Sequence, residues 1–269
     1  MSSSTSTACS NPKIRRWREL GSAHFHAGGG IISSFAYSRV EAAALLTAVV
    51  AGVLCLPFLH TVYWLGDEGI WLHGATRLSG GLRLYADFFE VSPPLGFLVV
   101  QGWLELFGNS LISVRILTAL TISGIAYLSF KACHSVSNSR VIAIMLTLTW
   151  VTASQGSWTQ TNHHWFATLL SMICLNALLS HQITRRQSII AGLAAGAAMS
   201  ITTSRGALTV LSALVSIAVT GNRRIVAWYI MAVLVVGVAN VLYIVGQSTI
   251  SAAFQDIIIG FAAARYSSV

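Results

Sequence analysis

Four carboxylates lie close together in the sequence, between residues 67 and 90: Asp67, Glu68, Asp87 and Glu90. They are half of the 8 acidic residues in the chain. The pKa of a carboxylate is tuned by a like-charged neighbour or a nearby arginine, and such a group can act as a general base. One of them alone would most simply be a solvated charge in a loop. Because four are crowded together with two arginines, this segment is predicted to hold a functional site.

The composition of the chain predicts a membrane protein. Hydrophobic residues make up 55% of the 269 positions, only 9% are charged, and the mean hydropathy is +0.71. A soluble domain of this size needs many more charged residues on its surface, so a soluble enzyme, a disordered chain and a collagen are excluded. Most of the net charge of +8 lies in short connectors between apolar runs. There it indicates orientation in the bilayer, and no nucleic-acid partner is expected.

Seven apolar runs approach the roughly 20 residues that a helix needs to cross a bilayer. They predict an all-α, polytopic transmembrane helix bundle. Residues 1–41, with a basic run, are expected to be a flexible cytoplasmic segment, and residues 42–269 the transmembrane domain. The runs cover about 42–65, 112–131, 141–156, 164–181, 187–203, 206–220 and 225–246.

A shorter run, 95–107, reaches only about 20 Å as a helix, and we expect a half-helix or an interfacial one. If it returns to its own side, and the basic amino terminus is cytoplasmic, three basic loops are also cytoplasmic, as lysine and arginine prefer. If the run 95–107 crosses the membrane fully, all three basic loops lie outside instead. We favour the first topology, which places 66–111, 156–164 and the turn around Arg205 outside. The basic loops hold Lys131 with Arg140, Arg185 with Arg186, and Arg223 with Arg224.

The first part of the acidic segment has the pattern of a helix in the membrane interface. Apolar residues recur at helical spacing, while polar residues take the other face. Gly80 and Gly81 then allow a sharp turn, and Pro93 with Pro94 fixes an extended approach to the next helix. The apolar residues are Trp71, Ala75, Leu78 and Leu82, and the polar ones are His73 and Arg77.

Several short motifs of this region stand in the order of a known family. Together they resemble the amino-terminal half of the GT-C membrane glycosyltransferases, most of all the bacterial relatives of protein O-mannosyltransferases and aminoarabinose transferases. The resemblance covers about residues 42–130 and continues more weakly through Asn162-His163-His164-Trp165 and residues 192–205. The motifs are Gly66-Asp67-Glu68-Gly69, Gly80-Gly81, Tyr85-Ala86-Asp87-Phe88-Phe89, Pro93-Pro94-Leu95, Leu106-Phe107-Gly108-Asn109-Ser110 and Arg115.

The resemblance implies an enzyme of the bacterial inner (plasma) membrane. It would move a hexose or pentose from a polyprenyl-phosphate carrier to an acceptor glycan, lipid or protein on the outer side. The resemblance implies that Asp67 is the catalytic carboxylate, with Glu68 its neighbour in the family's Asp-Glu pair. Inverting transfer needs a base for the acceptor proton and cations near the departing phosphate. Arg205, where the family often carries a lysine or arginine, is the candidate phosphate contact, and its alternative role is to cap a helix end.

Further residues of the same regions are candidates for binding the carrier, the sugar or the acceptor. Adjacent histidines on a helix face different directions and match no metal-ligand spacing, and the four cysteines form no CxxC pair. We therefore expect no metal and no cofactor besides the lipid-linked donor sugar. Anchoring in the interface, together with Trp165, is an equal interpretation of the histidines. The candidates are Arg83, Tyr85, Asp87, Glu90, His163 and His164.

The chain departs from the family in two ways. Ser92 stands where some relatives carry a basic residue before the proline pair. Full-length members are also longer, so the chain could be a truncated product, a degenerate copy, or one part of an enzyme completed by a second chain. Two other functions remain open: a transporter or flippase of lipid-linked sugar, and a non-catalytic membrane subunit. Transporters usually place ionisable residues at mid-membrane, and because the predicted spans have no acidic residue near their centres, the enzyme is favoured.

Overall fold

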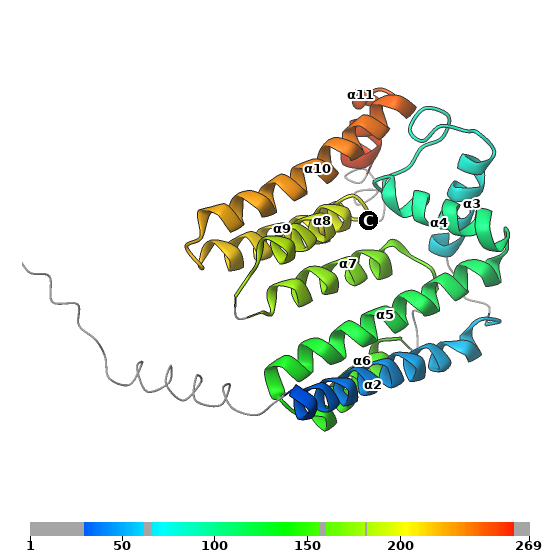
Figure 1. Cartoon of the computed structure of the whole chain (residues 1–269). Coiled ribbons are helices and arrows are strands. Elements are labelled where there is room, and N and C mark those ends of the chain that lie inside the picture. The colour runs from blue at the N-terminus through cyan, green and yellow to red at the C-terminus, as the bar shows by residue number, and fades with distance from the viewer. Residues whose placement is uncertain (1–29, 62–65, 156–159, 181, 261–269) are drawn as a thin grey trace, which may run out of the picture. The chain divides into compact units, whose positions relative to one another are not determined.

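A computed structural model describes residues 30–61, 66–155, 160–180 and 182–260 of the chain (Figure 1). Side chains are described for 38–61, 68–153, 160–180 and 182–257. These residues form helices and no β-strand, apart from a single bridge between Leu84 and Phe88, which confirms the all-α prediction for the described part. The basic run from Lys13 to Arg18 lies outside it.

The chain forms two compact units, residues 1–42 and residues 43–269. The boundary falls within the first described helix, α2, and the sites described below lie in the second unit. A helix occupies each of the seven predicted apolar runs. These helices are α2 (Gly30–Cys55), α5 (Leu111–Ser137), α6 (Arg140–Gln155), α7 (His163–Leu178), α8 (Arg185–Met199), α9 (Thr203–Ala218) and α10 (Arg223–Gln247).

Three of the helical segments are long and apolar enough to cross a membrane: Ser38–Phe58, Leu111–Ser137 and Arg223–Gln247. Their lengths of 21, 27 and 25 residues exceed the roughly 20 that a hydrocarbon core requires. Helices α6 to α9 have only 15 or 16 residues each. Length and composition therefore support a membrane protein with three such helices, and the full set of seven spans remains a prediction.

Short polar residues set where several helices begin. Ser110 and Asn162 accept hydrogen bonds from the backbone of the first turns of α5 and α7. Thr184 and Gln187 form a reciprocal capping box at the start of α8. Asn222 accepts from two backbone amides of α10. Because these caps satisfy amides that have no partner within a helix, they fix the ends of the helices from local sequence.

Helix α8 packs against α7, α9 and α10. Gly192 makes the approach to α10 possible, because a Cβ at this position would lie 2.5 Å from the carbonyl oxygen of Tyr229. One turn further on, a Cβ at Gly196 would lie 3.0 Å from the Cβ of Val236. Small residues spaced four apart thus allow the two helices to meet backbone to backbone, as in many membrane proteins.

Helix α3 (Gly66–Ser79) has the predicted helical face, and that face packs against protein. Trp71, Ala75 and Leu78 are buried in a core shared with α4 (Leu95–Phe107). Leu82 lies beyond the end of α3 and is 44% exposed, so the prediction that it continues this face is wrong. The helix ends earlier because the backbone turns at Gly80 and Gly81.

Helix α4 has both ends at the same end of the neighbouring helices. The amide of Leu95 donates to the carbonyl of Ser200, just after α8 (3.1 Å). Near the other end of α4, the indole nitrogen of Trp103 donates to the carbonyl of Ser113, in the first turn of α5 (2.8 Å). The end of α8 and the start of α5 both lie beside the start of α7, so α4 runs across this end and not along the helices.

Candidate functional site

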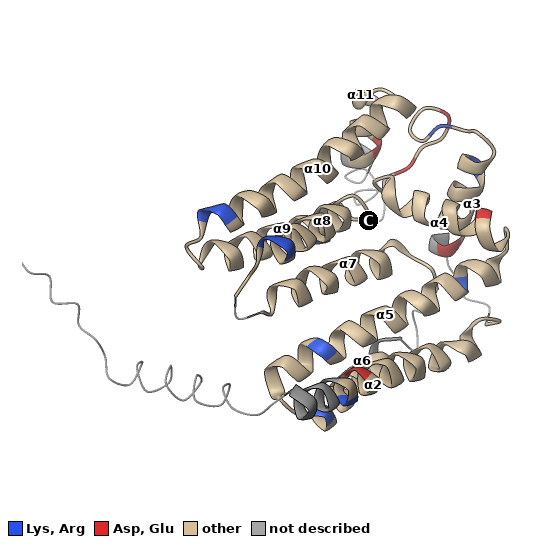
Figure 2. Cartoon of the chain, viewed as in Figure 1, with Lys and Arg blue, Asp and Glu red and all other residues tan. Residues whose placement is uncertain are grey.

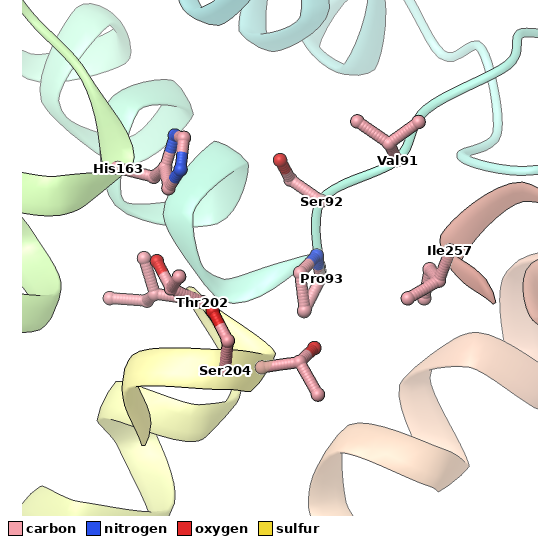
Figure 3. A pocket seen from close by; sticks show the side chains of 9 residues that line it. Val91, Ser92, Pro93, His163, Thr202, Ser204 and Ile257 are labelled. Carbon is pink, nitrogen blue, oxygen red and sulfur yellow. The ribbon is translucent and has the colours of Figure 1, made fainter. Parts of the chain in front are cut away.

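A cavity of about 340 Å³ lies where four separate parts of the chain meet (Figure 3). Its walls come from the loop before α4, the first residue of α7, the link between α8 and α9, and the helical segment η2 (Gln255–Gly260). The first three belong to stretches that the preferred topology places on one side of the membrane. The lining residues are Val91, Ser92, Pro93, His163, Ile201, Thr202, Thr203, Ser204 and Ile257.

The lining of this cavity, which we call the outer pocket, combines hydroxyl groups with apolar side chains. Ser92, Thr202 and Ser204 supply hydroxyls, whereas Pro93 and Ile257 supply apolar surface. The side chain of Ser92 and the imidazole ring of His163, on α7, point toward one another across the pocket (Figure 3). Hydroxyls can both donate and accept hydrogen bonds, so the lining suits a polar ligand with one apolar face.

His163 forms one wall of the outer pocket and is held by aromatic rings. Its ring centroid lies 5.5 Å from that of Trp71, which stacks on Phe97 at 4.2 Å. Burial, followed by the charges of His164 and Arg205, lowers the pKa of His163 to about 4. The imidazole is therefore neutral near pH 7, and its buried Nδ1 has no hydrogen-bond partner in the described part of the chain.

The α8–α9 link brings the start of α9 to the outer pocket. Thr202 is the N-cap of α9, but its side chain makes no capping bond, and its buried hydroxyl has no partner among the described residues. The residue is 9% exposed. Arg205 is exposed in the first turn of α9. A Cβ at Gly206 would collide with the backbone of Met199, so only glycine lets α9 turn back this tightly on α8.

The first amides of α9 give this part of the pocket a positive potential. Helix geometry leaves the amides of the first turn without partners within the helix, and the helix dipole adds partial positive charge there. The first described backbone bond into α9 is from Gly206 to the carbonyl of Thr202 (2.9 Å). Together with the Arg205 guanidinium and the Thr202 hydroxyl, these amides make the start of α9 suited to an anion.

The loop before α4 is braced by its own side chains. Tyr85 has a left-handed backbone (φ 65°), and its buried hydroxyl donates to the carbonyl of Ser92 (2.7 Å). Burial, with the nearby carboxylates of Glu90 and Asp256, raises the pKa of Tyr85, so the phenol stays protonated. This bond fixes the backbone that carries one wall of the pocket.

Arg83 and Asp87 pair with each other at the exposed turn of this loop. The backbone amide of Arg83 donates to Oδ2 of Asp87 (2.7 Å), and its guanidinium Nε lies 3.3 Å from the same oxygen. These bonds lower the pKa of Asp87. Both residues lie outside the pocket lining, and their contacts close the turn locally.

Glu90 is buried between the loop and the carboxyl-terminal segment. Its backbone amide donates to Oδ2 of Asp256 (3.3 Å), on η2. Burial raises the pKa of Glu90 to about 7; the Asp256 carboxylate also raises it, whereas a bond from the Val91 amide and the charge of Arg77 oppose the rise. Because Val91 and Ile257 line the pocket, this contact joins two of its walls.

Glu68 forms a buried ion pair with Arg115 of α5. The guanidinium donates through Nε to Oε1 (2.9 Å) and through Nη2 to Oε2 (2.8 Å), while Nη1 donates to the carbonyl of Leu59 (2.7 Å). The two side chains are only 8% and 6% exposed. The amide of Thr161 approaches the same carboxylate at 3.5 Å. Glu68 thus ties the start of α3 to α5 and to the segment before α7, and Arg115 extends this contact to Leu59.

Asp67 lies in the first turn of α3, and its side chain is outside the described residues. Of the other predicted site residues, His163 lines the pocket and Arg205 lies next to the lining residue Ser204. Tyr85 and Glu90 support the wall of the pocket through their bonds to Ser92 and Asp256. His164 packs its ring on that of His163 (3.9 Å). Glu68, Arg83 and Asp87 are engaged in ion pairs elsewhere.

Sequence reasoning missed several residues that line or support the site. The hydroxyls of Thr202 and Ser204 precede and begin a helix, and the run Thr202-Thr203-Ser204-Arg205 could have indicated an N-terminal anion site. Asp256 carried no such signal, because its contact with Glu90 depends on the fold. Trp71 was recognised only as part of an apolar face.

Comparison with known proteins adds no relative: no family model, no curated protein and no solved structure matches the chain.

Proposed function

We propose that the chain is a membrane glycosyltransferase that moves a sugar from a polyprenyl-phosphate carrier to an acceptor on the extracytoplasmic side. The single observation that carries this proposal is the outer pocket. It combines hydroxyl groups with the uncapped start of α9 and the adjacent Arg205, a setting suited to a sugar phosphate. The resemblance to GT-C enzymes supplies the reaction.

The start of α9 is the proposed phosphate site. The unpaired hydroxyl of Thr202 and the first amides of α9 would donate to phosphate oxygens, and Arg205 would supply positive charge. As the sugar leaves the carrier, charge develops on the phosphate oxygen, so these donors stabilise the transition state as well as the bound carrier. The neutral His163 and the Ser92 hydroxyl face the same space and would bind sugar hydroxyls.

Asp67 is the proposed base. It removes the proton of the acceptor hydroxyl or amine while the acceptor attacks the anomeric carbon of the sugar. The bond between this carbon and the phosphate oxygen breaks, and the phosphate keeps the electron pair. We assign Glu68 a structural role, because both of its oxygens are bound by Arg115. This ion pair would fix the first turn of α3, to which Asp67 belongs.

The same two helices that reach the pocket also offer a place for the lipid chain. A second cavity of about 420 Å³ lies further along α7 and α9, and its lining combines leucines, among them Leu175, Leu178 and Leu208, with serine and threonine hydroxyls. A polyprenyl chain attached to a phosphate at the start of α9 would run in this direction. Such a chain would bury apolar surface on both helices.

Donor turnover tests the proposed roles. The full chain, in membranes or purified, is given a synthetic polyprenyl-phosphate-linked hexose, and both donor binding and turnover are measured. Asp67→Asn should bind the donor and lower turnover by about 10² to 10⁴. Arg205→Ala should weaken donor binding by about tenfold or more, because a charged hydrogen bond to phosphate is lost. The control Arg140→Ala removes an exposed arginine at the start of α6 and should match the wild type.

Unimpaired turnover by Asp67→Asn would remove Asp67 from the mechanism. A folded wild-type chain that binds the donor without turnover, also in native membranes, would favour the non-catalytic subunit. Movement of the donor across vesicles without sugar transfer would favour the flippase.

A further inference from the structure

Four arginines meet at the opposite end of α8 from the outer pocket. Arg185 and Arg186 begin α8, and Arg223 and Arg224 begin α10. The two helices pack side by side and run in the same direction, because α9 connects them in the reverse sense. Figure 2 shows both basic pairs at neighbouring helix ends. All four side chains are exposed. We call this set the arginine cluster.

Direct contacts fix the two helix starts next to each other. The hydroxyl of Ser188 on α8 donates to the carbonyl of Ile225 on α10 (2.7 Å). The guanidinium of Arg185 lies 3.6 Å above the ring of Trp228, also on α10. Such a cation–π contact holds the arginine across the helix pair. The cluster is therefore a built feature of the α8–α10 contact and not a coincidence of two loops.

The described part of the chain places no carboxylate in an ion pair with these charges. The sequence has no aspartate or glutamate from residue 106 to residue 255, and no ion pair is found for the four arginines in the part of the chain that the structure describes. The starts of two parallel helices add further positive potential. Their caps, Thr184 and Asn222, are neutral. Four like charges on adjacent turns therefore attract anions from their surroundings.

The position of the cluster selects the source of those anions. Helix α10 is one of the three helices long and apolar enough to cross a membrane, and Arg223 and Arg224 are its first residues. Residues at the end of such a helix lie at the level of lipid headgroups. Exposed apolar side chains follow on both helices, at Ile190 and Leu193 of α8 and at Ile230 of α10. They offer surface to acyl chains directly next to the charges.

We propose that the arginine cluster is a binding site for an anionic phospholipid with two phosphates, of the cardiolipin class. A guanidinium binds phosphate oxygens through its paired N–H groups, and each of the two helix starts carries two arginines that could hold one phosphate. The two phosphates of the lipid would offset two of the four positive charges of the cluster and join the starts of α8 and α10. This inference is independent of the proposed transferase activity, because the cluster and the outer pocket lie at opposite ends of α8.

Lipid binding to the full chain in lipid nanodiscs tests the proposal. Native mass spectrometry measures cardiolipin retained by the wild type, by Arg223→Gln/Arg224→Gln and by the control Arg39→Gln/Arg140→Gln. The control removes two exposed arginines from other helices. The cluster variant should bind cardiolipin about 30-fold more weakly, since each arginine near an anionic headgroup contributes about 1 kcal/mol. The control should stay within about threefold of the wild type, and salt should weaken wild-type binding.

Equal retention of cardiolipin and phosphatidylcholine by the wild type would overturn the proposal whether or not the variants fold. Equal losses in the cluster variant and the control would overturn it too. Competition by inorganic pyrophosphate as effective as cardiolipin would assign the cluster to a soluble anion. Tighter binding of a short oligonucleotide than of cardiolipin would assign it to nucleic acid.

Discussion

At the scale of single residues, the acidic segment separates into groups with different chemical roles. Glu68 is bound on both oxygens, Asp87 is paired with Arg83, and Glu90 is buried beside another carboxylate. The sequence predicted that this segment is special, but not which carboxylate is engaged. That distinction depends on Arg115 and Asp256, which are far away in the chain and reach the segment only through the fold.

Glu90 gives a prediction for the dependence of stability on pH. Its pKa in the fold is about 7, above the ordinary value of 4.5. Folding therefore favours the neutral carboxyl group. Its contribution to the free energy of unfolding is fully present below pH 4.5 and is lost as the pH rises through about 7. Relative to Glu90→Gln, the wild type should lose on the order of 1 kcal/mol between pH 6.5 and pH 8. Thermal unfolding of both proteins across this range measures it.

The comparison with Glu90→Gln also cancels the opposite effect of His163. The pKa of His163 is lowered from 6.5 to about 4, so its contribution to the free energy of unfolding is present above pH 6.5 and is lost as the pH falls toward 4, equally in both proteins. If the stabilities of the wild type and Glu90→Gln change with pH in parallel, Glu90 is already ionised in the folded protein at pH 6.5, and the prediction is wrong.

At the scale of elements, local sequence predicts more of the helices than of their surroundings. All seven apolar runs are helical, and caps such as Thr184 and Asn222 stand at the starts of helices, where amides lack partners. The apolar face of α3 was predicted correctly from Trp71 to Leu78 and wrongly at Leu82. What covers this face was not predicted, because helical spacing tells that a face is buried and not what it packs against. An apolar face can pack against lipid or against protein, and here it packs against protein side chains such as the Phe97 ring.

The start of α9 is an element whose cap is left open, and Thr202 can test its use. Thr202→Val removes a buried, unpaired hydroxyl and keeps the shape of the side chain, so stability should be unchanged or slightly raised. Binding of polyprenyl phosphate should nevertheless weaken by about tenfold or more, because a donor to a charged ligand is lost. Thermal unfolding and a carrier titration give the two quantities.

Thr147 provides the matched control for this substitution. Its hydroxyl on α6 is also buried and has no partner among the described residues, but it is not part of the outer pocket. Thr147→Val should have a similar effect on stability and should leave the binding of polyprenyl phosphate unchanged. If both substitutions weaken carrier binding equally, or neither does, the start of α9 is not the phosphate site.

At the scale of the whole molecule, the sequence placed three separate stretches on one side of the membrane from the distribution of basic residues. The structure brings residues of all three stretches to one pocket, with η2 as the fourth wall. Charge counting could predict a shared side but not a shared cavity. The cavity depends on tertiary bonds such as Leu95 to Ser200 and Glu90 to Asp256, which no local pattern encodes.

Orientation in the bilayer follows from the same arrangement and can be measured directly. Ser79 is exposed at the end of α3, where its hydroxyl bonds to Glu105 of α4, and Gln182 is exposed just before the arginine cluster. If basic loops are cytoplasmic, a membrane-impermeant thiol reagent added to intact cells should label Ser79→Cys and leave Gln182→Cys unlabelled until the cells are opened. Gln182 takes no part in the capping box of α8, which Thr184 and Gln187 form, so its replacement leaves the start of that helix intact.

A chain without Cys9, Cys55, Cys133 and Cys174 supplies the background for this labelling. Reversed labelling would place the outer pocket in the cytoplasm, where an extracytoplasmic acceptor could not reach it, and the proposed function would have to be abandoned. Labelling of both positions in intact cells would mean that α8 does not separate the two sides, and the arginine cluster would then face the same solution as the pocket. Because α8 has only 15 residues, about 22 Å of helix, this experiment also decides whether so short a helix crosses the membrane.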